Sequence, residues 1–325
     1  MKVRIAPSGP APNYAPHYLA EDFGFFADEG LDVTSDTYAG PGSSWLADLL
    51  VDGRAEVALG GIWIPLAYEG RIAQLPAFAQ VCSRNPQVLM ARKPTDGFNW
   101  RDAYDKRVLL PLSSTSQWLF LEGALLEGGW QPSRISFIRD LEERTLTRLW
   151  RSGLGDYYLV TPPLSEELED EGFFVAADFA SQFGDVPWSV YYARRDFLEL
   201  EDAPALRLAR ALERALTWLS EHSADDISYV LRIRFPGVTH DRLARAVAGI
   251  KSRGVWSTTV DIPREPYLRY QSMIRRYGLT DDLASFHRMV VDQDFGHVSG
   301  GFDIASVKEA TDKKGGQQLG KTSHD

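Results

Sequence analysis

The sequence predicts an α/β protein with two Rossmann-like lobes, a hinge and a central cleft, and with helices from the C-terminal third packed on the lobes. Short apolar strands alternate with amphipathic helices up to about residue 193, and this pattern pauses near residues 92–97 before it starts again. Such alternation is typical of parallel sheets with helices on both faces. From about residue 204 the chain has helical spacing almost throughout, and 325 residues suffice for two domains.

The first lobe begins with two strand–loop–helix units. We expect strands over residues 3–7, 31–38, 57–59 and 78–83. Tyr18, Leu19, Phe23 and Phe26 share one face of a helix predicted over residues 14–26. A second helix follows from residue 45 to Gly53, and a third ends near residue 70.

The second lobe has the same plan. We expect strands over residues 108–110, 135–138, 157–160 and 173–176, and helices over residues 117–127, 142–151 and 164–171. A strand over residues 188–193 would return to the first lobe. The predicted division is therefore residues 1–88 and 190–299 for lobe 1 and residues 89–189 for lobe 2.

The remaining segment is helical and then polar. Helices are predicted over residues 205–219, 224–232, 240–251, 266–277 and 282–290. Residues 300–325 are rich in glycine and lysine and lack apolar side chains that could pack, so we expect a flexible tail.

Composition excludes several classes of function. The net charge of −10 argues against a nucleic-acid partner, which would need a basic face. Cys82 is the only cysteine and the six histidines lack metal-ligand spacing, so neither a disulfide within the chain nor a metal or other cofactor is expected. No stretch is long and apolar enough for a transmembrane segment or a signal peptide. The sequence as it stands therefore predicts a cytoplasmic protein, or a periplasmic or extracellular one if a signal was removed.

The predicted ligand site lies where loops leave the carboxyl ends of parallel strands. Loops over residues 8–14, 38–45, 60–63 and 112–118 combine small or hydroxyl residues with an aromatic one, which suits a small anionic or aromatic organic ligand. Glycine and serine are also ordinary turn residues, His17 could be structural and Arg84 could be a solvated surface residue. The candidate ligand-binding residues are Ser8, Asn13, Tyr14, His17, Tyr38, Gly42, Ser43, Ser44, Gly61, Trp63, Arg84, Ser113, Ser114, Thr115, Ser116, Trp118, Thr161 and Trp188.

One N-terminal stretch resembles a known family. Residues 11–20, APNYAPHYLA, followed by GFF at 24–26 and EGLDV at 29–33, resemble the opening of the SsuA/THI5-like (NMT1-like) solute-binding proteins of ABC importers. Residues 53–58, 113–116 and 153–156, and then Pro162-Pro163, are similar to later elements of that family. The resemblance implies a type II periplasmic-binding-protein fold with crossings near residues 84–92 and 186–192. It also implies an ABC permease as partner and a sulfonate, aromatic carboxylate or thiamine-pyrimidine precursor as ligand.

A cytosolic enzyme on the same scaffold is the alternative. The related pyrimidine synthases carry a cysteine-rich motif and a histidine after the third strand, and the desulfinases a cysteine in the first loop. Residues 60–65 and 8–13 contain neither histidine nor cysteine, so neither chemistry carries over. The carboxylate pairs at 142–143 and 166–167 resemble solvated helix faces, and no catalytic residue is assigned. The sequence favours binding, and a ligand-sensing module without a visible DNA-binding segment stays open.

Overall fold

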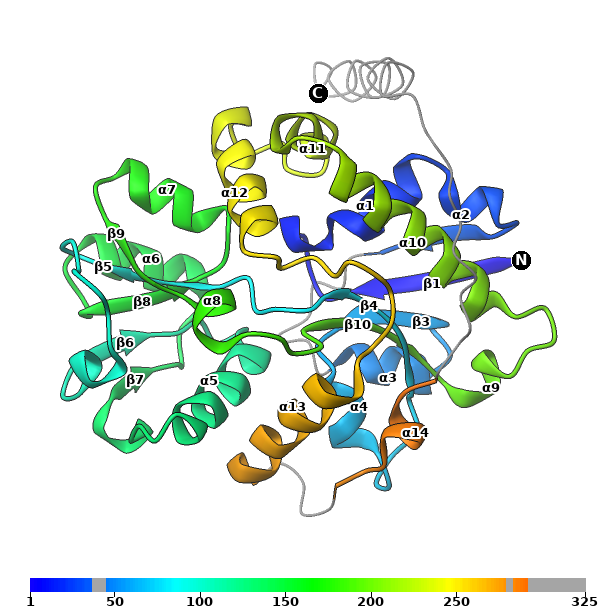
Figure 1. Cartoon of the computed structure of the whole chain (residues 1–325), viewed down its shortest axis with the longest axis horizontal. Helices are drawn as coiled ribbons and strands as arrows, with labels where there is room; N and C mark the ends of the chain where they lie inside the picture. Colours follow the sequence, from blue (N-terminus) through cyan, green and yellow to red (C-terminus); the bar gives the residue numbers. More distant parts are fainter. Residues whose placement is uncertain (37–44, 279–282, 292–325) are drawn as a thin grey trace.

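A computed structural model describes residues 1–36, 45–278 and 283–291 and shows two lobes, each built around a five-stranded sheet (Figure 1). The first sheet has the order β2-β1-β3-β10-β4. β1, β2 and β3 pair in parallel, whereas β10 runs antiparallel to both β3 and β4. These strands are β1 Lys2–Pro7, β2 Asp32–Ser35, β3 Val57–Gly60, β4 Ala77–Cys82 and β10 Ser189–Ala193.

The second sheet has the order β7-β6-β8-β5-β9. β6 pairs in parallel with β7 and β8, and β5 runs antiparallel to β8 and β9. These strands are β5 Val88–Ala91, β6 Arg107–Leu109, β7 Ser136–Ile138, β8 Tyr157–Val160 and β9 Phe174–Asp178.

Helices cover both sheets (Figure 1). The helices that connect strands are α1 Ala15–Asp22, α2 Phe25–Asp28, α3 Trp45–Val51, α4 Trp63–Tyr68, α5 Thr115–Glu127, α6 Glu143–Arg151, α7 Leu164–Asp170 and α8 Phe179–Phe183. The C-terminal helices are α9 Arg195–Leu198, α10 Pro204–Glu221, α11 Ala224–Leu231, α12 His240–Ser252, α13 Arg264–Tyr277 and α14 Phe286–Met289. Short 3-10 turns are η1 Pro12–Tyr14, η2 Trp100–Ala103 and η3 Pro132–Arg134.

The two-lobed α/β fold predicted from the sequence is confirmed, with two differences in detail. The sheets are mixed rather than parallel, because each contains one strand, β10 or β5, that runs against its neighbours. The helix expected over residues 14–26 is broken, because Gly24 takes a left-handed conformation with φ of 75°. The domain limits given above stay a prediction, and residues 300–325 lie outside the described part of the chain.

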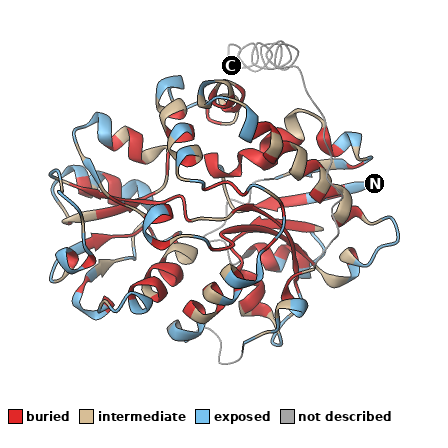
Figure 2. Cartoon of the chain, in the orientation of Figure 1, coloured by how far each residue is buried: buried red, intermediate tan, exposed pale blue. Residues whose placement is uncertain are grey.

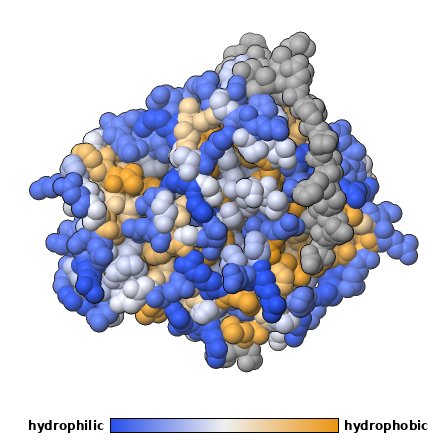
Figure 3. Space-filling model, in the orientation of Figure 1, coloured by the Kyte–Doolittle hydropathy of each residue, from blue (hydrophilic) through white to orange (hydrophobic). Residues whose placement is uncertain are grey.

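The core is apolar and fills both lobes (Figure 2). All residues of β3, β4 and β10 are buried. β3 and β10 are interior strands of the sheet, whereas β4 is an edge strand. In the second lobe Trp100, Phe179 and Phe183 form an aromatic cluster, which Phe120 and Trp188 extend toward the first lobe. On the face shown in Figure 3, apolar side chains appear only in patches between hydrophilic ones.

The two sheets are joined near the middle of the molecule (Figure 1). One connection runs from the end of β4 to the start of β5, and another from β9 through α8 to β10. Asn85 is fully buried in the first connection, where its Oδ1 accepts a hydrogen bond of 2.9 Å from the backbone N–H of Gln87. These short connections bring the ends of β1 and β3 opposite those of β6 and β8.

Candidate ligand-binding cleft

A cavity of about 470 Å³ lies between the lobes, a size typical of small-molecule sites. Loops after β1 and β3 line it from the first lobe, and loops after β6 and β8 from the second. The structure brings half of the residues predicted from the sequence together here. They are Ser8, Asn13, Tyr14, Gly61, Ser113, Ser114, Ser116, Thr161 and Trp188.

The first-lobe wall is held in place by buried polar contacts. The hydroxyls of Ser8 and Tyr14 lie 2.6 Å apart. The backbone carbonyl of Asn13 accepts hydrogen bonds of 3.1 Å from both the Cys82 thiol and the Trp256 indole N–H. Burial raises the pKa of Tyr14 above its usual range, so its hydroxyl stays neutral and can donate a hydrogen bond.

Cys82 supports this wall from behind and does not line the cavity. Its side chain is fully buried, and burial raises the pKa of the thiol to about 12. A thiol with this pKa is not ionised at neutral pH and is not a nucleophile.

The second-lobe wall presents the N-terminus of α5. Ser114 is the N-cap residue of this 13-residue helix and makes no side-chain capping bond, while Ser116 and Gln117 line the cavity from the first turn. The first N–H groups of a helix have no acceptor within the helix and carry positive partial charge. This part of the cavity is therefore suited to an anionic group.

Acidic side chains lie on another side of the cavity. Glu143 and Glu167, from the first turns of α6 and α7, both line it. The side chain of Glu143 is open to the cleft but surrounded by protein, and the resulting loss of hydration raises the pKa of its carboxyl. The cavity is therefore lined on one side by the N-terminus of α5, which favours an anion, and on another side by the carboxylates of Glu143 and Glu167.

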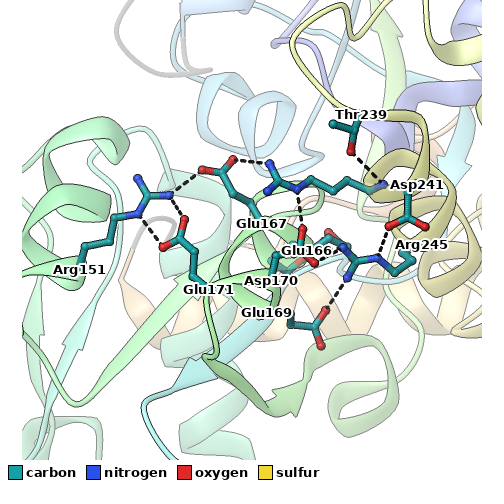
Figure 4. Close-up of polar contacts among 11 residues, drawn as sticks. Arg151, Glu166, Glu167, Glu169, Asp170, Glu171, Thr239, Asp241 and Arg245 are labelled. Atoms are coloured by element: carbon teal, nitrogen blue, oxygen red, sulfur yellow. Dashed lines mark hydrogen bonds and ion pairs between the residues drawn. The ribbon is translucent and has the colours of Figure 1, made fainter.

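An ion-pair network between α7 and α12 lies at the edge of the cavity, and its residues point toward one another in Figure 4. Asp170 accepts hydrogen bonds from Arg242 Nε at 2.6 Å and from Arg245 Nη2 at 2.5 Å. Arg151 pairs with Glu167 at 2.6 Å and also with Glu171. Arg242 itself lines the cavity, so the C-terminal helices form part of the site.

A contact between the lobes limits the cavity on one side. The indole N–H of Trp63, at the start of α4, donates a hydrogen bond of 2.6 Å to Ser116 Oγ in α5. Gly61 lies beside this pair, and a Cβ atom there would be only 2.7 Å from Ser116 Oγ and from Trp63 Cδ1. A side chain at position 61 would therefore force the two apart.

Other candidate residues lie away from this cavity. Trp63, Thr115 and Trp118 line a second cavity. His17 is fully buried, with its Nδ1 2.6 Å from the Tyr191 hydroxyl. Arg84 bonds Asp185 at 2.6 Å and the backbone carbonyl of Arg253 at 3.0 Å. Tyr38, Gly42, Ser43 and Ser44 lie outside the described residues.

Several lining residues were not predicted from the sequence. The sequence predicts Glu143 and Glu167 on solvated faces of helices. Arg242 belongs to α12, and no local sequence pattern indicates that this helix passes over the cleft. A signal did exist for Gln117 and Ser189, which adjoin predicted site residues. Gly9, Pro10, Ala11 and Gln117 lie in the predicted loops 8–14 and 112–118 although they are not among the candidate residues. The other lining residues that were not predicted are Pro86, Glu143, Pro162, Pro163, Leu164, Glu167, Ser189, Gly237, Val238 and Arg242.

The profile of the family described as NMT1/THI5 like matches residues 11–225, which is more than half of the chain. The chain belongs to the NMT1/THI5-like family. This agrees with the resemblance seen in the N-terminal sequence. This membership and the polar cleft between the two lobes agree with a protein that binds small solutes.

A bacterial protein is similar to most of this NMT1/THI5-like chain. It is 27% identical over 293 residues to YtlA of Bacillus subtilis (strain 168), described as a candidate binding protein, and the match covers 89% of this chain and 87% of YtlA.

Solved structures share the fold of this NMT1/THI5-like protein. The periplasmic aliphatic sulphonate binding protein SsuA from Escherichia coli is 16% identical with a TM-score of 0.69, covering 89% of this chain and 96% of SsuA. A protein from Methylobacillus flagellatus KT is described as the periplasmic sulfonate-binding protein SsuA of a candidate sulfonate ABC transporter. It is 16% identical with a TM-score of 0.70, covering 97% of this chain and 96% of its own. At these identities the likeness shows the fold alone.

The described residues include no helix with the length and apolar character needed to cross a membrane.

Proposed function

We propose that this protein captures a small organic anion in the cleft between its lobes, with a sulfonate as the first candidate, and delivers it unchanged to an ABC importer. The observation that carries the proposal is the N-terminus of α5, which faces the cavity without a side-chain cap. An anionic head placed there would meet N–H donors and the positive end of the helix dipole.

The hydroxyl groups around the cavity support the same ligand chemistry. Ser8 and Tyr14 from the loop after β1, Ser113 after β6 and Thr161 after β8 line the cavity, and their hydroxyls can donate hydrogen bonds to several oxygens of one head group. A tetrahedral sulfonate has three such oxygens, whereas a carboxylate has two. An aromatic carboxylate and a thiamine-pyrimidine precursor remain the other candidate ligands.

The importer is proposed from the relatives. Both SsuA structures are described as periplasmic sulfonate-binding proteins, and one is assigned to an ABC transporter. We infer that this chain also works outside the cytoplasm beside an ABC permease.

Catalysis on the same scaffold is the alternative that the experiment must separate from binding. The described residues that line the cavity include no histidine and no cysteine, and Cys82 is buried behind the wall. The described residues that line the cavity therefore supply neither a cysteine nucleophile nor a histidine base.

The test is a thermal-shift and calorimetry panel of methanesulfonate, benzenesulfonate, benzoate and an aminopyrimidine. We expect a sulfonate to raise the melting temperature and to be recovered unchanged by mass spectrometry. Recovery of a converted product would support the enzyme instead.

A pair of variants locates the head group. Ser113→Asp places a negative charge before α5 and should weaken sulfonate binding at least about tenfold. Ser113→Asn is the neutral control of similar size and should bind within about threefold of the wild type. Position 113 is exposed, so both variants should fold. Equal affinity of the two variants would contradict an anion site at this helix end.

A further inference from the structure

A second cavity of about 680 Å³ lies on the other side of the Trp63–Ser116 contact. Its lining is largely apolar and aromatic and includes Trp63, Leu110, Trp118, Leu119 and Phe137. Trp118 and Phe137 pack edge to face, with ring centroids 4.8 Å apart. Such a lining favours a flat apolar group.

The positively charged side chain of Arg139 lines the second cavity. The guanidinium carbon of Arg139 lies 3.8 Å from the centroid of the Trp118 ring, so the guanidinium rests against the indole. Among the described residues Arg139 forms no ion pair, although Asp140 lines the same cavity and the charge of Arg139 acts on Glu122 from further away. The Trp118 ring covers one face of the guanidinium, and Arg139 lines the cavity, so its N–H groups can donate hydrogen bonds to a ligand oxygen there.

The two cavities are separate but adjacent. Ser114 lines both, whereas Trp63 lines only the second and Ser116 only the first. The Trp63–Ser116 hydrogen bond therefore forms the partition between them. A molecule in the second cavity would contact neither Ser8 nor Tyr14 in the first.

We propose that the second cavity is an independent subsite for a planar aromatic group that bears an acidic substituent. The ring lies among Trp63, Trp118 and Phe137, and the acidic group binds the guanidinium of Arg139. This subsite goes beyond the proposed function, since it needs no ligand in the first cavity.

The experiment uses 2-naphthalenesulfonate as the aromatic probe and methanesulfonate as the small one, both titrated by calorimetry into the full chain. We expect naphthalenesulfonate to bind also when methanesulfonate is saturating. Arg139→Gln should weaken naphthalenesulfonate about tenfold and leave methanesulfonate unchanged. Position 139 is exposed, so this variant should fold, which circular dichroism checks.

Arg144→Gln is the matched control, because Arg144 is an exposed arginine in α6 that lines neither cavity. The proposal is overturned if naphthalenesulfonate does not bind, if methanesulfonate displaces it completely, or if Arg139→Gln affects it no more than Arg144→Gln. Failure of methanesulfonate to bind would count against the proposed function instead, and the comparison of the two variants with naphthalenesulfonate would still decide the subsite.

Discussion

At the scale of single residues, His17 is a titratable side chain enclosed in the core of the first lobe. It packs against the rings of Tyr18, Phe26 and Tyr191, and its Nδ1 lies 2.6 Å from the Tyr191 hydroxyl. Burial, with a smaller contribution from the charge of Arg234, lowers the pKa of His17 to about 3. The imidazole is therefore neutral in the folded protein at neutral pH.

This pKa predicts a dependence of stability on pH. In the unfolded chain the histidine binds a proton below about pH 6.5, whereas in the folded chain it does so only near pH 3. Between these values the unfolded state binds more protons, so the free energy of unfolding falls as the pH is lowered. One such group contributes at most about 1.4 kcal/mol per pH unit.

The variant His17→Gln tests this contribution. Glutamine can still bond the Tyr191 hydroxyl but does not titrate. Urea unfolding at a series of pH values between 6.5 and 4 should therefore show a shallower loss of stability in the variant than in the wild type. Parallel curves for the two proteins would contradict a buried neutral His17.

The candidate site residues show which placements can be predicted from a sequence. Ser8 and Thr161 directly follow predicted strands, Ser113 comes three residues after the end of another, and the carboxyl ends of parallel strands share an edge of a sheet. Their arrival at one cavity thus follows from local patterns. Arg242 lies more than 70 residues further along the chain, and its place over the cleft depends on the route of the C-terminal helices.

At the scale of elements, the packing of α13 on α5 connects the C-terminal segment to the second lobe. Gly123 in α5 permits this contact, because a Cβ atom there would lie 2.5 Å from Met273 Cβ and 3.0 Å from its Cα. The Cα atom of Met273 belongs to the backbone and cannot move away by a change of rotamer. α13 also touches α4 of the first lobe, so one helix contacts both lobes.

We expect Gly123→Val to lower the free energy of unfolding by about 1–3 kcal/mol, the usual effect of overpacking. The matched control is Gly249→Ala in α12, another helical glycine, whose nearest neighbour is the flexible end of Arg253 at 3.4 Å. This change should be neutral or stabilise by up to about 1 kcal/mol, since alanine favours helix. Chemical denaturation measures both. Equal stability of the Gly123 variant and the wild type would contradict the close approach of the helices.

The order of elements was largely predictable, but strand direction was not. Strand β5 occupies Val88–Ala91, inside the crossing that the family resemblance implies near residues 84–92, and Asn85-Pro86 and Arg92-Lys93-Pro94 are turn-like on both sides of it. Four apolar residues between such signals fit either a short strand or a buried linker. Pairing of β5 against β8 and β9 depends on tertiary contacts far away in the chain.

At the scale of the whole molecule, the ion pairs of Asp170 link α7 of the second lobe to α12. α7, which carries Asp170, belongs to the second lobe, and α12 supplies Arg242 and Arg245. Lys251 at the end of α12 donates hydrogen bonds to the carbonyls of Leu219 and Ser220 in α10, which packs on α1 of the first lobe. Movement of the lobes apart at the cavity would therefore separate Asp170 from the two arginines.

Removing this bridge should favour a more open molecule. Asp170→Asn removes the carboxylate charge that both arginines face, and we expect the ratio of open to closed molecules to rise about two- to fivefold, as is usual for exposed ion pairs. Small-angle X-ray scattering of the ligand-free protein should show a larger radius of gyration at low salt. The difference from the wild type should shrink as added salt screens the pairs. Asp241→Asn is the matched control, because it changes the net charge equally but its ion pair with Arg245 lies within α12. An equal expansion of both variants, or none in Asp170→Asn, would show that net charge or the hinge strands, and not this bridge, set the separation of the lobes.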